Sequence, residues 1–220
     1  MAEDRVRDCL NLDFAALLCS RLCHDLVSPV GAIGNGVEIL RDEDDEEMRG
    51  QVLSLLEDSA RQTSNRLQFF RLAFGAAGGF GSTLDAREAH KAAANFFGGG
   101  KVDLDWLPDS APMPKDVVKL VLNLVLIASE SLIRGGRIAV DLRLEDDRYQ
   151  GCITATGERL LLADTVRKAL IEGLPRAELE PRSAPAQLCF MLAKALGAVV
   201  RVELNAPHRL SMNFSLAKPA

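Results

Sequence analysis

The stretch SRLCHDLVSPVGAIGNGVEIL, residues 20–40, decides the fold of the N-terminal part of the chain. Apolar residues recur through it at steps of three and four, as they do on one face of a helix in a bundle. We therefore expect one long amphipathic helix that begins upstream of this stretch. Its apolar stripe comprises Leu12, Ala15, Cys19, Leu22, Leu26, Val30, Ile33, Val37 and Leu40.

A second helix is expected after the acidic stretch RDEDDEE (residues 41–47), in which Asp44 and Glu47 can cap its start. Because the link is short, the two helices should be antiparallel neighbours. They cannot cover each other's apolar faces, whereas two copies of the hairpin related by a two-fold axis form a four-helix bundle. The sequence therefore predicts a homodimer; the alternative is that the rest of the same chain covers the hairpin. The second stripe comprises Leu53, Leu56, Ala60, Thr63, Leu67, Phe70 and Phe74.

The glycine-rich stretch GAAGGFGST (residues 75–83) separates this hairpin from a second part with a different pattern. We expect a hairpin domain over 1–76, a linker over 77–83 and a second domain over 84–220. Interspersed strands and helices with an antiparallel end predict an α+β fold, in which the second domain is a sandwich of one sheet with helices on one face. The expected helices span 84–97, 115–133, 161–171 and 186–196, and the expected strands span 101–106, 137–144, 149–156, 199–204 and 209–216.

The composition is that of an ordinary folded protein, with 220 residues of which 48% are hydrophobic and 26% are charged. The net charge of −5 argues against a broad basic surface for nucleic acid. Five cysteines without a CxxC pair favour free thiols in a reducing cytoplasm. No apolar run approaches the roughly 20 residues that span a bilayer, and the charged N-terminus lacks a signal-peptide core. We therefore expect a cytoplasmic protein whose partners are neither nucleic acid nor membrane.

His24 is the candidate reactive residue of the first helix. Leu22 and Leu26 lie on the apolar stripe, and residues two apart on a helix point about 200° apart, so His24 should face away from the bundle core. A neutral imidazole keeps a lone pair on one ring nitrogen for attack on phosphorus. Arg21 can neutralise part of the charge of a phosphoryl group. The neighbours of His24 on its face are Ser20, Arg21, Val27, Ser28 and Gly31.

Asp25 allows two interpretations that the spacing does not separate. It can orient the second ring nitrogen of His24 or accept its proton, or it can pair with Arg21, four residues back. Pro29 lies inside the expected helix, where it removes one donor and leaves the carbonyl of Asp25 without its usual partner. A bend beside His24 is therefore expected.

Other candidate sites favour structural explanations. Cys19 and Cys23 lie four residues apart, but no second cluster completes a tetrahedral metal site, and Cys19 falls on the buried stripe. His90 and His208 are expected to be surface or structural residues. GGGK (98–101) lacks the spacing of a phosphate-binding loop and is best explained as a helix stop. We expect no metal site in the chain.

The segment HDLVSPVGAIGNGVEIL (24–40) resembles the H-box of sensor histidine kinases, in which a phosphorylated histidine is followed by an acid and, five residues on, by proline. It is more similar still to the ChpT-type histidine phosphotransferases of alphaproteobacteria, whose first helix carries the same Cys-His-Asp run before a Ser-Pro pair. Two further segments resemble the ATP-binding domain of the kinases. KLVLNLVLIASESLIRGGRIAV (119–140) resembles its N-box region, and LCFMLAKALGAVVRVE (188–203) resembles its last helix and strand.

The second domain departs from the kinase pattern where that pattern binds nucleotide. Of two asparagines four residues apart, the second of which helps hold Mg-ATP in the kinases, only Asn123 is present; Ile127 replaces the other and cannot ligate a hard cation. The kinase run Asp, any, Gly, any, Gly reads ATGER here (155–159), without the aspartate that recognises adenine. The glycine-rich box has become SAPAQLCF (183–190), and the lid is short. The resemblance thus implies a kinase-like fold that has lost its nucleotide site.

The resemblance implies a histidine phosphotransferase of a two-component phosphorelay. His24 would accept the phosphoryl group from a receiver-domain phosphoaspartate, such as that of a hybrid kinase, and pass it to the aspartate of a response regulator. No cofactor is expected, because the receiver would supply Mg²⁺. Receivers should dock beside His24 on Val27, Gly31 and Asn35. Two alternatives are an active sensor kinase fragment and a non-catalytic dimeric scaffold derived from a kinase.

Overall fold

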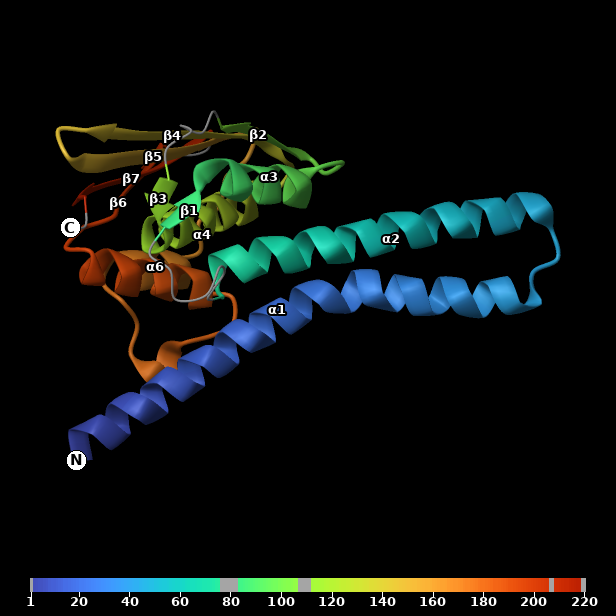
Figure 1. Cartoon of the computed structure of the whole chain (residues 1–220), viewed down its shortest axis with the longest axis horizontal. Coiled ribbons are helices and arrows are strands. Elements are labelled where there is room, and N and C mark those ends of the chain that lie inside the picture. Colours follow the sequence, from blue (N-terminus) through green and yellow to red (C-terminus); the bar gives the residue numbers. More distant parts are fainter. Residues whose placement is uncertain (1, 76–82, 107–111, 206–207, 219–220) are drawn as a thin grey trace.

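The N-terminal part of the chain is an antiparallel pair of long helices, α1 (Ala2–Asp42) and α2 (Glu46–Ala73), as predicted (Figure 1). The predicted cap was wrong. Asp45, not Asp44, is the N-cap of α2, and its side chain accepts a hydrogen bond from the amide of Met48 at 2.9 Å. The reason is that α1 continues to Asp42, which makes Asp45 the last residue of the link. The computed structural model describes residues 2–75, 83–106, 112–205 and 208–218.

Helix α1 contains Pro29, which is buried. The helix changes direction part-way along its length, so that its C-terminal part runs beside α2 while its N-terminal part diverges from it (Figure 1). A proline inside a helix removes one donor and crowds the carbonyl four residues back, which is a recognised cause of such a bend. The predicted bend of this helix is therefore confirmed.

The second part of the chain contains two sheets and four α-helices among the described residues. In chain order its elements are β1 (Thr83–Asp85), α3 (Ala86–Phe97), β2 (Val102–Trp106), β3 (Pro112–Pro114), α4 (Lys115–Ser131), β4 (Gly136–Glu145), β5 (Arg148–Thr156), α5 (Asp164–Ile171), the 3-10 helix η1 (Arg176–Glu178), α6 (Ala184–Ala195), β6 (Arg201–Asn205) and β7 (Arg209–Ala217).

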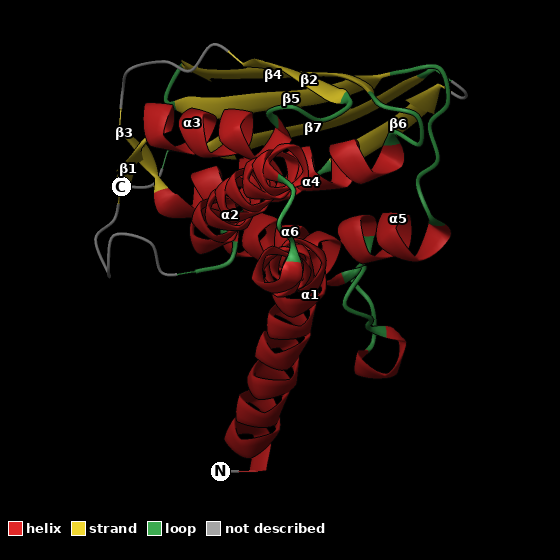
Figure 2. Cartoon of the chain, turned by 90° about the vertical axis from the view of Figure 1, so that its right-hand side faces the viewer, coloured by secondary structure: helices red, strands yellow, loops and turns green. Residues whose placement is uncertain are grey.

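The main sheet has five strands in the order β2-β4-β5-β7-β6, and helices cover one of its faces, as predicted (Figure 2). Strand β2 is parallel to β4, and the other neighbours are antiparallel. The sequence did not predict the small sheet of β1 and β3. Strands of three residues, one of them with two prolines, are too short to show an alternating pattern.

The hydrophobic core lies between the main sheet and its helices and continues into the end of α2. Leu120 and Leu124 of α4 are fully buried. Phe69 of α2 is fully buried in the same core, with its ring centroid 4.3 Å from that of Phe96 on α3. The end of the hairpin is thus anchored in the second part of the chain. The predicted linker 77–83 lies outside the described residues except for Thr83.

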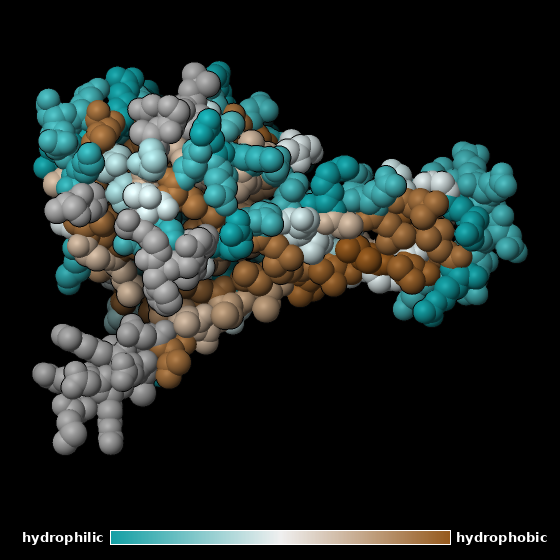
Figure 3. Space-filling view, in the orientation of Figure 1, coloured by the Kyte–Doolittle hydropathy of each residue, from teal (hydrophilic) through white to brown (hydrophobic). Residues whose placement is uncertain are grey.

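The rest of the hairpin keeps an apolar face exposed in a single chain (Figure 3). The described residues of the second part leave this face exposed, contrary to the alternative that the rest of the same chain covers the hairpin. The span Leu12–Asp42 is long and apolar enough to cross a membrane, which corrects the expectation that no segment approaches that length. Length and composition alone are weak evidence for a membrane. The large exposed apolar residues of the hairpin are Leu12, Val27, Val30, Val37, Ile39, Met48, Leu53, Leu55 and Leu67.

Candidate functional site

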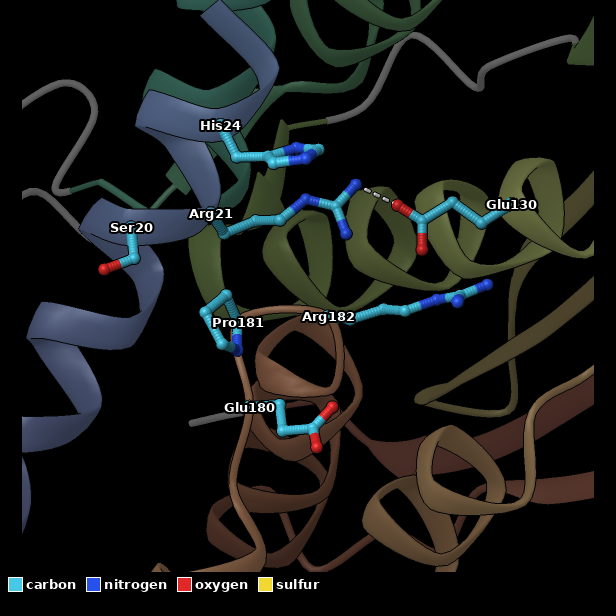
Figure 4. A pocket seen from close by; sticks show the side chains of 7 residues that line it. All are labelled: Ser20, Arg21, His24, Glu130, Glu180, Pro181 and Arg182. Atoms are coloured by element: carbon cyan, nitrogen blue, oxygen red, sulfur yellow. Dashed lines mark hydrogen bonds and ion pairs between the residues drawn. The ribbon is translucent and has the colours of Figure 1, made fainter. Parts of the chain in front are cut away.

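His24 lies on the outside of α1, where its side chain is 83% exposed. The predicted outward orientation is therefore confirmed. The ring borders a cavity of about 720 Å³ between α1, the end of α4 and the loop before α6 (Figure 4). The cavity is lined by Ser20, Arg21, His24, Glu130, Glu180, Pro181 and Arg182.

The Asp25 carboxylate makes both of the contacts that the sequence left open. Its Oδ1 lies 3.1 Å from Nδ1 of His24, and its Oδ2 accepts from Nε and Nη2 of Arg21, each at 3.1 Å. A carboxylate oxygen only accepts, so Nδ1 carries the proton and the lone pair of the neutral ring is on Nε2. Nε2 is therefore the nucleophilic nitrogen of this exposed ring.

Arg21 also forms an ion pair with Glu130 at the end of α4, 109 residues away in the sequence (Figure 4). Burial alone would lower the pKa of Arg21, but the charges of Glu130 and Asp25 outweigh this effect and raise the pKa. Burial raises the pKa of Glu130, and the charge of Arg21 opposes that shift. The guanidinium that we expected to neutralise a phosphoryl group is thus shared between two carboxylates.

Four of the predicted contact residues lie along α1 outside the cavity. Val27, Ser28, Gly31 and Asn35 are all exposed, Val27 to 69%. A Cβ added at Gly31 would meet no atom within 4 Å. These residues form an open stretch of helix surface next to His24.

Sequence reasoning missed the far wall of the cavity, which comes from the second part of the chain. Glu130 belongs to a segment that was interpreted as a helix and through its likeness to the N-box, and residues 180–182 belong to a loop that was not considered as a site. No spacing in the sequence connects these residues with His24, because only the packing of α1 against the second part brings them together.

The residues at the nucleotide positions of the kinase pattern have structural contacts in this chain. Asn123 is fully buried, and its Nδ2 donates to the carbonyl oxygens of Ala73 at 2.9 Å and Lys119 at 2.8 Å. Ile127 is 2% exposed and belongs to the core. Among the described residues, no group of three or more His, Cys, Asp or Glu side chains could hold a metal ion.

Cys19 and Cys23 are both exposed. The expectation that Cys19 is buried was therefore wrong for a single chain. Cys19 lines an apolar groove of about 490 Å³ between α1 and α2, together with Leu22, Leu67 and Phe74. This part of the stripe therefore borders an open groove in a single chain.

Residues 86–208 match the family model described as the histidine phosphotransferase C-terminal domain. The protein phosphotransferase ChpT of Brucella abortus (strain 2308) is 36% identical over 195 residues, which is 89% of this chain and 92% of that relative. The chain belongs to the histidine phosphotransferase family. The resemblance seen in the sequence is thereby confirmed.

A solved structure of a bacterial phosphotransferase has the same fold as this histidine phosphotransferase. The two are 35% identical and superpose with a TM-score of 0.81, over 92% of this chain and 96% of that chain. This coverage includes residues of both the hairpin and the second part. The histidine kinase AdeS of Acinetobacter baumannii superposes with a TM-score of 0.46 at 10% identity, over 90% of this chain and 98% of that chain. That likeness is too distant to bear on function.

Proposed function

We propose that this histidine phosphotransferase is a phosphorelay intermediate. His24 accepts a phosphoryl group from the phosphoaspartate of a receiver domain, such as that of a hybrid kinase, and passes it to the aspartate of a response regulator. The observation that carries this proposal is the exposed His24 ring, with Nδ1 against Asp25 and the lone pair on Nε2. Membership of the family supports it.

In the accepting step the Nε2 lone pair attacks phosphorus in line with the acyl phosphate bond. The Nε2–P bond forms, the P–O bond to the aspartate breaks, and its electron pair leaves with the aspartate carboxylate. The ring keeps its Nδ1 proton and becomes cationic, which the Asp25 carboxylate 3.1 Å away stabilises. The donating step reverses these bonds on another receiver. Mg²⁺ in the acidic pocket of the receiver would offset the phosphoryl charge, so the chain needs no cofactor of its own.

We infer that ATP is not the phosphoryl donor. Asn123 is fully buried, and its Nδ2 donates to two carbonyl oxygens, so this side chain is not accessible to a nucleotide. The position four residues on is the buried, apolar Ile127. The run ATGER (155–159) has no carboxylate where the kinase pattern recognises adenine. The donor must then be another phosphorylated protein.

Receivers are proposed to dock by laying a helix along α1 beside His24. Val27, Gly31 and Asn35 supply an exposed and locally flat surface there, because a glycine lets a neighbouring backbone approach closely. Ser20 and Ser28 would lie at the margins of this surface.

The chain is also proposed to be a cytoplasmic homodimer, with the exposed apolar face of the hairpin as its interface. Leu53→Glu would place a charge on the predicted stripe, where Leu53 is 51% exposed in a single chain. Leu161→Glu is the control, because Leu161 is 58% exposed outside the hairpin. Light scattering should give a dimer mass for the wild type and the control and a monomer mass for Leu53→Glu. A dimer in all three proteins would rule out this interface.

The function is tested by radiolabel transfer with wild type and His24→Gln. Each protein is mixed with a phosphorylated receiver domain and, separately, with labelled ATP and Mg²⁺. We expect label to pass from the receiver to the wild type alone, with none taken from ATP. Label taken from ATP would instead indicate an active kinase. Failure of several receivers to label the wild type, with receiver binding unaffected by His24→Gln, would indicate a scaffold.

A further inference from the structure

The side chains behind His24 form a continuous chain of contacts from α1 to α4. Nδ1 of His24 contacts Oδ1 of Asp25, Oδ2 of Asp25 accepts from Arg21, and Arg21 donates to Oε1 of Glu130. Figure 4 shows Arg21 extending from α1 toward Glu130, with the His24 ring lying beside it. The last member therefore comes from a different part of the fold than the first three.

Exposure falls sharply behind the nucleophile. The His24 side chain is 83% exposed, whereas those of Asp25, Arg21 and Glu130 are 11%, 12% and 25% exposed. Exposed ion pairs contribute little because water and salt screen them. Partly buried, charge-assisted hydrogen bonds are stronger and fix geometry better. The contacts that hold Asp25 are therefore stronger and better fixed in geometry than an exposed surface ion pair.

We propose that Glu130 is a positioning residue for His24, acting through Arg21 and Asp25. An arginine side chain has many rotamers, and the pair with Asp25 alone would leave its guanidinium tied only to its own helix. Glu130 accepts from the same Nη2 atom that donates to Asp25 and so ties the guanidinium to α4, which fixes the Asp25 carboxylate and the Nδ1–H tautomer of His24. This inference rests on the proposed function, since a defined Nε2 lone pair matters only if Nε2 attacks phosphorus.

Glu130 also sets the charge next to the nucleophile. The charged groups around His24 are Asp25 and Arg21 on α1, Glu130 on α4, and Glu180 and Arg182 on the loop before α6. Without Glu130, Arg21 would be balanced by Asp25 alone and would be drawn toward the Oδ1 atom that holds Nδ1. The loss of Glu130 should therefore weaken the preference for the Nδ1–H tautomer.

The test variant is Glu130→Gln, which removes the charge and nearly keeps the shape. Burial disfavours the ionised form of Glu130, so a neutral side chain here should not unfold the protein. The matched control is Glu158→Gln, because Glu158 pairs with Arg134 at 2.8 Å in an exposed ion pair of the second part. Both variants are made in the full chain, labelled with ¹⁵N-histidine.

Two measurements are made on each protein. The ¹⁵N shifts of the His24 ring, assigned by comparison with His24→Gln, report the tautomer. The rate of label transfer from a phosphorylated receiver reports the reaction. We expect wild type and Glu158→Gln to have mainly the Nδ1–H tautomer. Glu130→Gln should shift toward Nε2–H and accept phosphoryl about five- to tenfold more slowly, the effect of losing about one charge-assisted hydrogen bond.

A wild-type tautomer and wild-type rate in Glu130→Gln would overturn the inference. If that variant is too unstable to measure, Glu130→Asp retains the charge but withdraws it by one methylene, and the same loss is expected. A slower rate with an unchanged tautomer would also refute the positioning role, since that result indicates a contact with the receiver instead. If His24→Gln still accepts label, the proposed function itself fails, which is a separate outcome.

Discussion

Asn123→Ala should destabilise the protein without changing its chemistry. The Asn123 side chain is fully buried, and its Nδ2 donates to the Ala73 carbonyl at the end of α2 and to the Lys119 carbonyl within α4. Each buried hydrogen bond contributes about 1 kcal/mol, and an unpaired carbonyl adds a cost of about 1–3 kcal/mol. Among the described residues Oδ1 of Asn123 has no partner, so its removal offsets about 1 kcal/mol of this loss.

The net cost of Asn123→Ala is therefore about 2–4 kcal/mol, which for a chain of this size lowers the melting temperature by about 4–16 °C. Asn123→Asp should cost more, because it sets carboxylate oxygens against two carbonyl oxygens. Circular dichroism melts at one fixed protein concentration measure both changes, since dimerisation would make the melting temperature depend on concentration. Transfer of label from a receiver, measured well below the melting temperature, should remain within about twofold of the wild type.

The matched control for this prediction is Asn65→Ala. Asn65 also donates its Nδ2 to a backbone carbonyl, that of Asn95 at 3.0 Å, but in an exposed contact. Its loss should cost less than about 1 kcal/mol. Wild-type stability in Asn123→Ala would refute the structural role. Loss of transfer or of nucleotide binding at unchanged stability would show that Asn123 serves a ligand.

Three further outcomes are expected. Gly31→Ala should keep the fold, because the added Cβ meets no atom within 4 Å, and should slow transfer from receivers. Gly50 on α2 has equally open space around it, so Gly50→Ala should not slow transfer. Equal transfer rates in the two variants would contradict docking at Gly31. Burial raises the pKa of the Cys189 thiol, so mass spectrometry after brief alkylation should find Cys23 modified in the native protein and Cys189 modified only after unfolding; early labelling of Cys189 would contradict its place in the core. Burial also raises the pKa of Glu130 above its ordinary value of 4.5, so the native state holds this proton more tightly than the unfolded chain. The free energy of unfolding of wild type relative to Glu130→Gln should then fall as the pH rises above about 4.5. An opposite slope in urea titrations would refute the shift.

The elements of the fold were largely predictable because each leaves a local pattern. The stripes of α1 and α2 follow a helical period, and the alternating residues of β4 and β5 indicate a hairpin. The cap of α2 was not predictable from spacing, since Asp42, Asp44 and Asp45 are all candidates and only the end of α1 selects among them. The small sheet of β1 and β3 has no local pattern at all.

The site divides in the same way. The outward face of His24 follows from its angle to Leu22 and Leu26, which is a local property of one helix. The contact between Arg21 and Glu130 crosses 109 residues, and it depends on where the second part of the chain packs against α1. Such contacts are decided by tertiary packing, so a single sequence contains no signal for them.

Helix α4 carries both the residues of the proposed loss of nucleotide binding and the proposed positioning residue of His24. Asn123 and Glu130 lie seven residues apart on α4, so they face nearly the same side of the helix two turns apart. Asn123 holds the end of α2, and Glu130 holds Arg21 of α1. Ile127, between them in the sequence, faces the core. The helix that carries nucleotide contacts in the kinase pattern thus holds both helices of the hairpin in this chain. A buried asparagine that holds α2 is not accessible to a nucleotide. In the proposed relay, the absence of ATP binding and the support of His24 would therefore be two consequences of one arrangement.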